Sequence, residues 1–405
     1  MFLETLFFDN VEGYSSLRRH SQSLLSHHKT KVSRQGLDKR FNGAAVEMLR
    51  MLFERAFAKQ VLNKSSHSSW SSCFAGIRIM DSTEFKLPAQ MAGAFPGYGG
   101  DGTAACAQLQ FEYEVFSRRI TGISIGNALD SDKKEGMRDV DAIPPKTLLL
   151  RDLGYYNLDI YRQLEARDIY YISRLSPHLK IYAREGDGFL ELSHGKIIER
   201  IASGGGGQMD IDVFVGKEAK HPVRLSAHRL SGEQSARRQK RLWARKGKLS
   251  EKDWMSSQLN LFVTNVPRQT CTAQQLHELY KVRWQIELVF KAWKGISRIE
   301  KVHKMDVNRF RCILLVKLLW IMMNWNLLVL FQNVARQELS LHKLSATVKD
   351  RLPHLRDLLK EGSHEIEVWL LKLFEISRIH CRKENRNGRQ RLEEILSMSL
   401  IFSKL

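Results

Sequence analysis

TLLLRDLGYYNLDIYRQLEARDIYYIS, residues 147–173, predicts a strand, a helix and a second strand in succession. TLLLR and IYYIS, near its two ends, are short apolar runs of the kind that form buried strands. Between them, LDIYRQLEARD (158–168) has apolar residues at helical spacing. Strands that alternate with a helix are typical of an α/β sheet, so this segment sets the fold class that we expect.

Further strands are expected on either side of this segment. IRIMD (77–81) is a short apolar run that ends in an acid, and AQLQFEYEVFS (107–117) and ITGISIG (120–126) have the pattern of a strand pair joined by a tight turn. LFVTNVP (261–267) returns to strand. Together with residues 147–173, these runs predict a mixed α/β sheet.

The regions outside these strands differ from them in composition and in predicted secondary structure. Residues 1–70 are expected to be mostly helical, because LDKRFNGAAVEMLRMLFERAF (37–57) has apolar residues at helical spacing; this helix fits a small DNA-binding module or an ordinary amphipathic helix equally well. Residues from about 175 to 258 are polar and glycine-rich, and we expect a β-rich insertion there. Its last part, SARRQKRLWARKGK (235–248), suits a solvated face or mobile loop, or a contact with phosphate. Residues from about 300 onward are expected to be helical.

Charge and composition limit the class of partner. Among 405 residues, 64 Lys and Arg exceed 44 Asp and Glu by 20, which favours nucleic acid or an anionic membrane surface. Five scattered cysteines without a CxxC pair exclude a zinc ribbon and fit a reducing cytoplasm. The apolar run at 312–331 is about long enough to span a bilayer, but it contains Lys317 and two asparagines, so we expect a buried core helix and no membrane partner.

One basic helix carries a single acid. In LYKVRWQIELVFKAWKG (279–295), the residues Tyr280, Arg283, Glu287, Lys291 and Lys294 are spaced 3, 4, 4 and 3 apart. On a continuous α-helix they fall within about 80° of one face and extend over ~21 Å, enough to follow several phosphates of one DNA strand. A solvated face with ion pairs four residues apart would also account for Glu287.

Two further acids follow apolar strands. Asp81 comes after IRIM and Asp152 after TLLLR, and the carboxyl-terminal edge of a sheet is where ligand sites usually form. A carboxylate at Glu287 would repel phosphate unless it holds a divalent cation. Two such ions about 4 Å apart activate the attacking water or hydroxyl and stabilise the leaving oxygen. Two strand-end aspartates and one helix glutamate would supply the ligands.

These residues resemble a known family. Y-x2-R-x3-E-x6-K, matched in full between residues 280 and 294, resembles the signature of a large branch of bacterial insertion-sequence DDE transposases. DST (81–83) resembles the first-aspartate motif of that branch, and RDLGYY (151–156) resembles the second. The resemblance covers about residues 75–300. It implies an RNase H-like catalytic core with a β-strand insertion ahead of the helix that bears the glutamate.

The resemblance also implies a cut-and-paste mechanism. Asp81, Asp152 and Glu287 would bind two Mg²⁺ (or Mn²⁺) ions; water would attack the phosphodiester at each transposon end, and the freed 3′-OH would attack target DNA. The partners would be the double-stranded DNA of the transposon ends and of the target, which a homodimer would hold in a synaptic complex. DGT (101–103) also resembles the first-aspartate motif, but no apolar strand precedes it, so Asp81 is preferred.

The same resemblance suggests how DNA is held. Tyr280, Arg283 and Lys294 would bind the DNA end through its phosphates, and we add Lys291 because it shares their face. Some relatives flip a base onto a tryptophan just before the strand that corresponds to LFVTNV. In this chain that position is Asn260, which leaves open whether Trp243 or Trp254 substitutes and whether a DNA hairpin forms.

The expected organisation is a helical DNA-binding region at 1–70, a catalytic domain at 71–300 with its insertion, and a helical region at 301–405 that pairs two subunits. We expect a cytoplasmic, nucleoid-associated bacterial enzyme. Two other functions are open: a non-catalytic DNA-binding protein from a decayed element, and an RNase H-like nuclease that cuts without joining.

Overall fold

The computed structural model describes residues 1–13, 16–63, 68–99, 103–176, 179–218, 220–384 and 392–396. The chain forms two compact units, each assembled from three separate segments. The first contains residues 1–67, 82–130 and 285–390, and the second contains residues 68–81, 131–284 and 391–405. Strand β1 (Gly76–Leu87) therefore contributes its first half to the second unit and its second half to the first.

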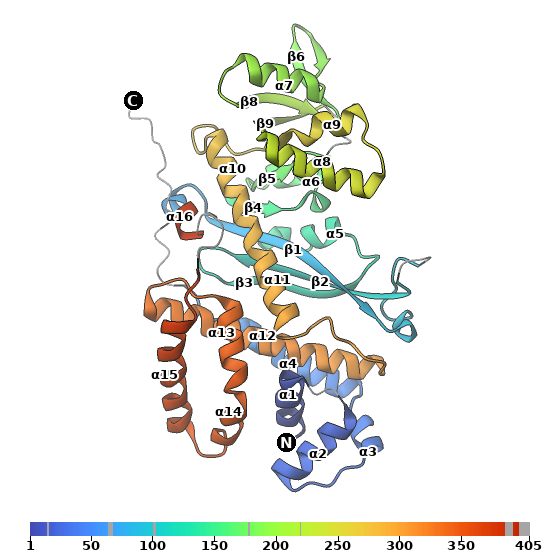
Figure 1. Ribbon diagram of the computed structural model, residues 1–405, viewed down its shortest axis with the longest axis vertical. Helices are drawn as coiled ribbons and strands as arrows, with labels where there is room; N and C mark the ends of the chain where they lie inside the picture. The colour runs from blue at the N-terminus through green and yellow to red at the C-terminus, as the bar shows by residue number, and fades with distance from the viewer. Residues whose placement is uncertain are drawn as a thin grey trace. The chain divides into compact units, whose positions relative to one another are not determined.

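The second unit is built on a sheet with the strand order β1-β4-β5-β10-β9-β8-β6-β7 (Figure 1). Strands β1, β4 and β5 run parallel, whereas each later pairing is antiparallel. All five residues of β4 are buried, which explains its continuous apolar sequence. The strands after β1 are β4 (Thr147–Arg151), β5 (Tyr170–Arg174), β6 (Ile181–Glu185), β7 (Gly188–Glu191), β8 (Gln208–Val215), β9 (His221–Arg229) and β10 (Leu259–Thr264).

Helices cover this sheet. Asn157 caps α6 by accepting a hydrogen bond from the amide of Ile160, and α6 buries Ile160, Tyr161 and Leu164 in the same core as the sheet. The unit's helical elements are η1 (Ser69–Ser72), α5 (Asp132–Met137), η3 (Val140–Ala142), η4 (Leu153–Tyr155), α6 (Leu158–Glu165), α7 (His194–Ser203), α8 (Gly232–Lys246), α9 (Glu251–Ser257), α10 (Ala273–Lys281), η5 (Val282–Trp284) and α16 (Leu392–Leu396).

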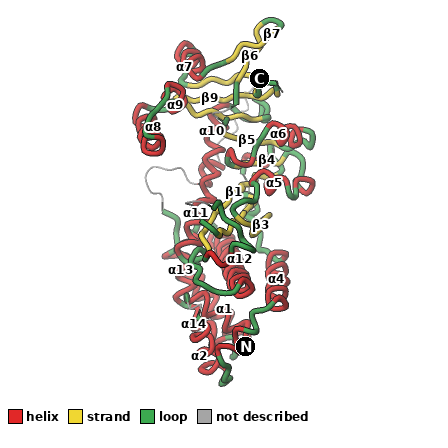
Figure 2. Tube along the Cα trace, turned by 90° about the vertical axis from the view of Figure 1, so that its right-hand side faces the viewer, coloured by secondary structure: helices red, strands yellow, loops and turns green. Residues whose placement is uncertain are grey.

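The first unit is mostly helical (Figure 2). Besides the second half of β1 it holds the antiparallel pair β2 (Ala105–Glu114) and β3 (Ile120–Asn127). Helices α13, α14 and α15 lie side by side in Figure 1. The unit's helical elements are α1 (Phe2–Glu12), α2 (Leu17–His28), α3 (Arg34–Asp38), α4 (Gly43–Ala58), η2 (Ala89–Met91), α11 (Gln285–Gly295), α12 (Val307–Ala335), α13 (Leu341–Asp350), α14 (Leu352–Leu358) and α15 (Ser363–His380).

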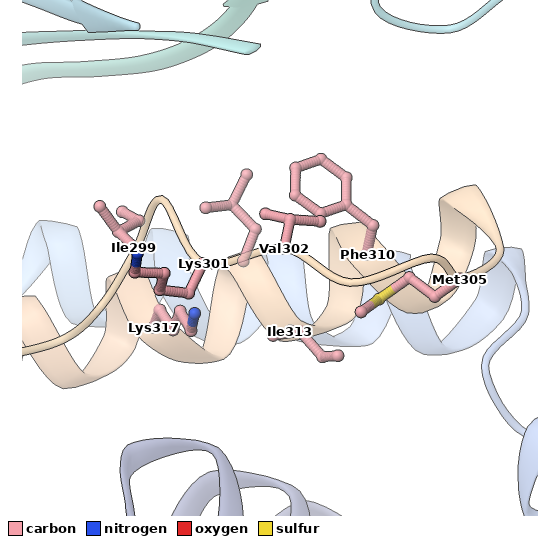
Figure 3. A pocket seen from close by; sticks show the side chains of 8 residues that line it. Ile299, Lys301, Val302, Met305, Phe310, Ile313 and Lys317 are labelled. Carbon is pink, nitrogen blue, oxygen red and sulfur yellow. The ribbon is translucent and has the colours of Figure 1, made fainter. Parts of the chain in front are cut away.

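Helix α12 contains the long apolar run. It is long and apolar enough to cross a membrane, but 78% of its most apolar window is buried, so the prediction of a core helix is confirmed. Lys317 is buried on it, and its amine donates a hydrogen bond to the carbonyl oxygen of Arg298 at 2.7 Å. Beside Lys317 lies a small pocket between α12 and the preceding loop (Figure 3), lined by Ile299, Lys301, Val302, Met305, Phe310, Ile313, Leu314 and Lys317.

The predicted mixed α/β class is confirmed, and strands form where the runs at 77, 107, 120, 147, 169 and 261 predict them. The segment 175–258 contains the four strands β6–β9, but also the helices α7, α8 and α9, which the sequence analysis did not predict. Its basic run forms helix α8 rather than a loop, begun by a capping box at Ser231. Asp101 of the alternative DGT motif lies outside the described residues.

Two predictions of local structure are wrong. Asp81 does not end β1: the strand continues to Leu87, because Thr83, Phe85 and Leu87 alternate into the interior. Pairing with β4, however, is recorded only as far as Met80.

The helix at 279–295 is also not continuous. The 3₁₀ turn η5 separates α10 from α11 at Val282, which is fully buried. Tyr280 and Arg283 belong to the second unit, whereas α11 belongs to the first. The prediction of one continuous α-helix is therefore wrong, and the prediction of a single face from Tyr280 to Lys294 stays a prediction.

Candidate active site

The first two aspartates lie next to each other in the second unit. Met80 of β1 pairs with Arg151 of β4 in a parallel register, and Asp81 and Asp152 follow these two partners directly. Neighbouring strands are about 4.8 Å apart, so the two backbones are adjacent at the edge where pairing ends. Both residues are half-buried. This is the strand-edge position that the sequence predicts for a ligand site.

Arg283 contacts the first aspartate. Its Nη1 donates to Oδ2 of Asp81 at 2.8 Å, and the two side chains are only 14% and 21% exposed. The turn η5, which carries Arg283, packs against β4. One of the predicted DNA-binding residues is therefore part of the same cluster as the aspartates, and its charge offsets the repulsion between two neighbouring carboxylates.

Tyr280 lies behind this ion pair. Its ring packs on Phe262 of β10 with centroids 4.8 Å apart, and the residue is 6% exposed. The described residues offer its hydroxyl no hydrogen-bond partner. Burial raises the pKa of Tyr280 to about 12; Arg283 and Arg174 lower it, and Asp152 and Asp81 raise it. At neutral pH the phenol therefore keeps its proton as a hydrogen-bond donor.

Arg174 is a site residue that sequence analysis missed. It ends β5, and its guanidinium carbon lies 5.7 Å from the centre of the Tyr280 ring. Leu150 of β4 pairs with Ile172 of β5. Asp152 lies two residues after Leu150 and Arg174 lies two residues after Ile172, so Asp152 and Arg174 occupy corresponding positions on neighbouring segments. The rule that drew attention to Asp81 and Asp152, a polar residue after a buried strand, also selects Arg174 in the run IYYISR.

Arg151 supports the second aspartate. This residue is 2% exposed, and its Nη1 donates to the carbonyl oxygen of Gly136 in α5. A β-carbon at Gly136 would lie 3.1 Å from the Tyr155 ring and 3.2 Å from Arg151 Nη1. A larger residue at position 136 would therefore displace Arg151 or Tyr155, the residues that precede and follow Asp152.

Glu287, Lys291 and Lys294 lie on α11 of the first unit. Glu287 and Lys294 are half-buried and Lys291 is exposed. The opposite side of α11 packs Trp293 on Phe111 of β2, with centroids 4.7 Å apart, as the amphipathic pattern predicts. Among the residues that the structure describes, no group of three or more His, Cys, Asp or Glu forms a ready metal site. Asp81 and Asp152 come together; that Glu287 joins them stays a prediction.

Comparison with known families decides the class. Residues 72–323 match the family model described as the transposase DDE domain. The chain belongs to this family. It is therefore an insertion-sequence DDE transposase, an enzyme that cleaves DNA and transfers strands.

Curated relatives agree along nearly the whole chain. The transposase for insertion sequence element IS231B of Bacillus thuringiensis subsp. berliner is 28% identical over 91% of this chain and 82% of its own length. The IS231F transposase of Bacillus thuringiensis subsp. israelensis is 29% identical over 92% and 83%, and that of IS1151 from Clostridium perfringens is 27% identical over 72% and 66%. A solved piggyBac transposase synaptic complex with hairpin DNA covers 97% of this chain and 78% of its own, with a TM-score of 0.42 and 7% identity; a likeness this distant adds no argument.

The transposase has no aromatic residue at position 260. Instead, Oδ1 of Asn260 accepts a hydrogen bond of 2.7 Å from Nη2 of Arg238, whose Nη1 donates to the carbonyl oxygen of Leu259 at 2.7 Å. Trp243 and Trp254, the two candidate substitutes, are 58% and 50% exposed on α8 and α9. At the position just before the LFVTNV strand, where the resemblance leads us to expect an aromatic ring, the chain thus has a hydrogen-bonded polar pair, Arg238 and Asn260.

Proposed function

We propose that this transposase cuts at its element's terminal inverted repeats and joins the 3′-OH ends to target DNA, with Asp81, Asp152 and Glu287 holding two Mg²⁺ or Mn²⁺ ions. The observation that carries the proposal is the parallel register of Met80 with Arg151, which places the carboxylate-bearing residues Asp81 and Asp152 directly after two paired residues of adjacent strands. Such oxygen donors fit Mg²⁺, which binds one or two carboxylates together with substrate phosphates. Glu287 would supply a third carboxylate for the second ion.

The chain's own residues would each have a limited role. Asp81 and Asp152 would fix the position of the reacting phosphodiester, with Arg283 holding Asp81 in place through its ion pair. The buried hydroxyl of Tyr280 would donate to a phosphate oxygen, since it has no partner among the described residues. When bound, the ions would supply an activated nucleophile and stabilise the leaving oxygen.

The remaining positive charges would hold the DNA. Lys291 is exposed on α11, and it and the half-buried Lys294 would bind phosphates of the transposon end. Residues 1–70 would add a DNA-binding region, residues 71–300 the catalysis, and residues 301–405 the pairing of two subunits in a synaptic complex. The enzyme would act in the bacterial cytoplasm, on the DNA of the nucleoid.

Cleavage of a duplex that carries one transposon end tests the proposal. We expect Glu287→Gln to abolish Mg²⁺-dependent cleavage while leaving binding of the duplex intact, because the amide has the shape of the carboxylate but lacks the negative charge that holds a divalent cation. Glu251→Gln, on the exposed first turn of α9, is the matched control and should cleave normally. Cleavage by Glu287→Gln at the rate of the control would refute the site. Cleavage without joining to target DNA by the native enzyme would indicate a nuclease instead.

A further inference from the structure

Helix α8 gathers its arginines on one face. At about 100° per residue, Arg237, Arg238, Arg241 and Arg245 fall within a sector of roughly 100°. We call these four residues the arginine face. Trp243 projects from another side of the same helix. Arg241 and Arg245 are both exposed, so their guanidinium groups are accessible to a ligand.

Two of these arginines are already engaged within the protein. Arg237 forms an ion pair with Glu233, and Arg238 is anchored to β10 by its bonds to Leu259 and Asn260. No ion pair or hydrogen bond is recorded for Arg241 or Arg245 in the described part of the chain, although they lie four residues apart, where like charges repel. An anionic partner would relieve this repulsion.

The arginine face continues toward the aspartates. Arg238 donates to Asn260 of β10, and Phe262, two residues further along β10, pairs with Arg174 of β5. Arg174 in turn stands over the Tyr280 ring, and Arg283 lies 6.0 Å from the same ring and contacts Asp81. All of these residues belong to the second unit. Arg283, Arg174 and Arg238 thus form a series of arginines between the aspartate pair and α8.

The spacing suits a nucleic-acid backbone. Arg238 and Arg245 are separated by about 10 Å along the helix axis. One DNA strand presents a phosphate every ~3.4 Å along its axis, so this stretch covers about three nucleotides. Arginine binds phosphate oxygens with two parallel hydrogen bonds, which suits such contacts better than lysine.

We propose that the arginine face of α8, continued by Arg174, is a sequence-independent binding site for the DNA backbone next to the phosphodiester that the transposase cuts. The location of this site next to the cleaved phosphodiester rests on the proposed function. The binding of the DNA backbone by α8 rests on the charges of its arginines. The structure thus favours phosphate contact over a merely solvated face for the basic run at 235–248.

Salt-dependent binding tests the proposal without any catalysis. We would measure the dissociation constant of a fluorescently labelled DNA duplex of arbitrary sequence in EDTA over a range of salt concentrations. Arg241→Gln/Arg245→Gln is compared with Lys240→Gln/Lys252→Gln, which removes two exposed positive charges from another side of α8 and from α9. Because metal is absent, failure of the metal site has no effect on this result.

Loss of two phosphate contacts should reduce the slope of log affinity against log salt by about 1.8. Over a fourfold rise in salt, the native enzyme should then lose roughly tenfold more affinity than the arginine variant. Arg241→Lys/Arg245→Lys should keep most of the slope, which separates lost charge from misfolding. Equal slopes for the arginine and lysine-to-glutamine variants would overturn the proposal. Preferential binding of the native enzyme to anionic phosphatidylserine vesicles over DNA would also overturn it.

Discussion

Arg283 and Tyr280 show how single residues of one motif take different positions. Arg283 reaches the carboxylate of Asp81, whereas Tyr280 is buried against Phe262 with its hydroxyl unpaired among the described residues. The sequence predicts one face for both, and the guanidinium carbon of Arg283 does lie 6.0 Å from the centre of the Tyr280 ring. At this scale, the motif identifies the residues and the structure gives each a distinct contact.

Removing the ion pair should impair DNA cleavage. In Arg283→Ala the carboxylate of Asp81 loses its fixed position, and misplacement of a catalytic group by about 1 Å costs roughly hundredfold in rate. We therefore expect slower cleavage and weaker positioning of the transposon end, measured by single-turnover cleavage and footprinting. Arg162→Ala, which breaks an exposed pair with Asp159, is the control and should behave as the native enzyme. An unchanged rate and footprint for Arg283→Ala would contradict this role.

Tyr280→Phe separates stability from binding. Removing a buried hydroxyl that lacks a partner should leave the free energy of unfolding unchanged or raise it by up to about 1 kcal/mol. Affinity for the transposon end should fall, because the proposed bond to a phosphate oxygen is lost. Urea unfolding and duplex binding measure the two effects. A variant less stable than the native protein would show that the hydroxyl already has a partner in the free enzyme.

The elements around Asp152 are held by close packing. Arg151 of β4 donates to Gly136 of α5, and any larger residue at position 136 would press on Arg151 and Tyr155. Helix α5 therefore contacts the residues on either side of Asp152, at the edge of the sheet where we propose the active site. Its role is to hold β4 and η4 in place.

Gly136→Ala should lower both stability and cleavage. Overpacking of this kind typically costs about 1–3 kcal/mol, and the strain falls on the chain at Asp152. Gly43→Ala is the matched control, since a β-carbon at the start of α4 meets nothing within 4 Å. Thermal unfolding and cleavage rates distinguish the two. Native-like cleavage by Gly136→Ala would show that α5 does not support the aspartate.

Helix α10 makes stability depend on pH. Burial, followed by the charges of His228 and Lys281, lowers the pKa of His277 to about 4 from 6.5. Between these values the unfolded chain binds the proton and the folded chain does not, so stability is fully present above pH 6.5 and falls as pH drops toward 4. His277→Gln should flatten the decline, whereas exposed His364→Gln should not. Urea unfolding across this range measures the slope; identical slopes would contradict the assignment.

The positions of the strands could be predicted from the sequence more reliably than the points at which strands and helices end. Apolar runs such as TLLLR fixed the buried strands, because a strand buried on both faces needs a continuous apolar sequence. The extension of β1 beyond Asp81 and the break at Val282 depend on contacts with residues distant in the chain, which local patterns do not contain. Arg174 was missed because only acids were sought at strand ends.

At the scale of the whole molecule, the compact units do not follow the order of the chain. The N-terminal helices pack with those near the C-terminus: Arg356 of α14 donates to Asp9 of α1 at 3.2 Å, and Asp9 also contacts His20 of α2 at 2.9 Å. Arg356, Asp9 and His20 are 4%, 3% and 2% exposed. The sequence gives no sign of this network, because its members are up to 347 positions apart.

Breaking this network should destabilise the first unit. Arg356→Met leaves Asp9 as a buried charge without its guanidinium, which typically costs about 3–5 kcal/mol. Arg356→Met/Asp9→Leu removes both charges and should recover much of that loss. Urea unfolding of the single and double variants gives the coupling between the two residues. Additive effects of the two substitutions would show that the contact contributes no stability.

The central claim is that Asp81, Asp152 and Glu287 surround two divalent cations, and location of Mn²⁺ in crystals of the transposase with its terminal-repeat DNA tests it most directly. Anomalous scattering should show two Mn²⁺ ions about 4 Å apart beside the cleaved phosphodiester, one bound by Asp81 and Asp152 together and the other reached by Glu287. A map in which no ion contacts Asp152, or in which Glu287 lies away from both ions, would contradict the account.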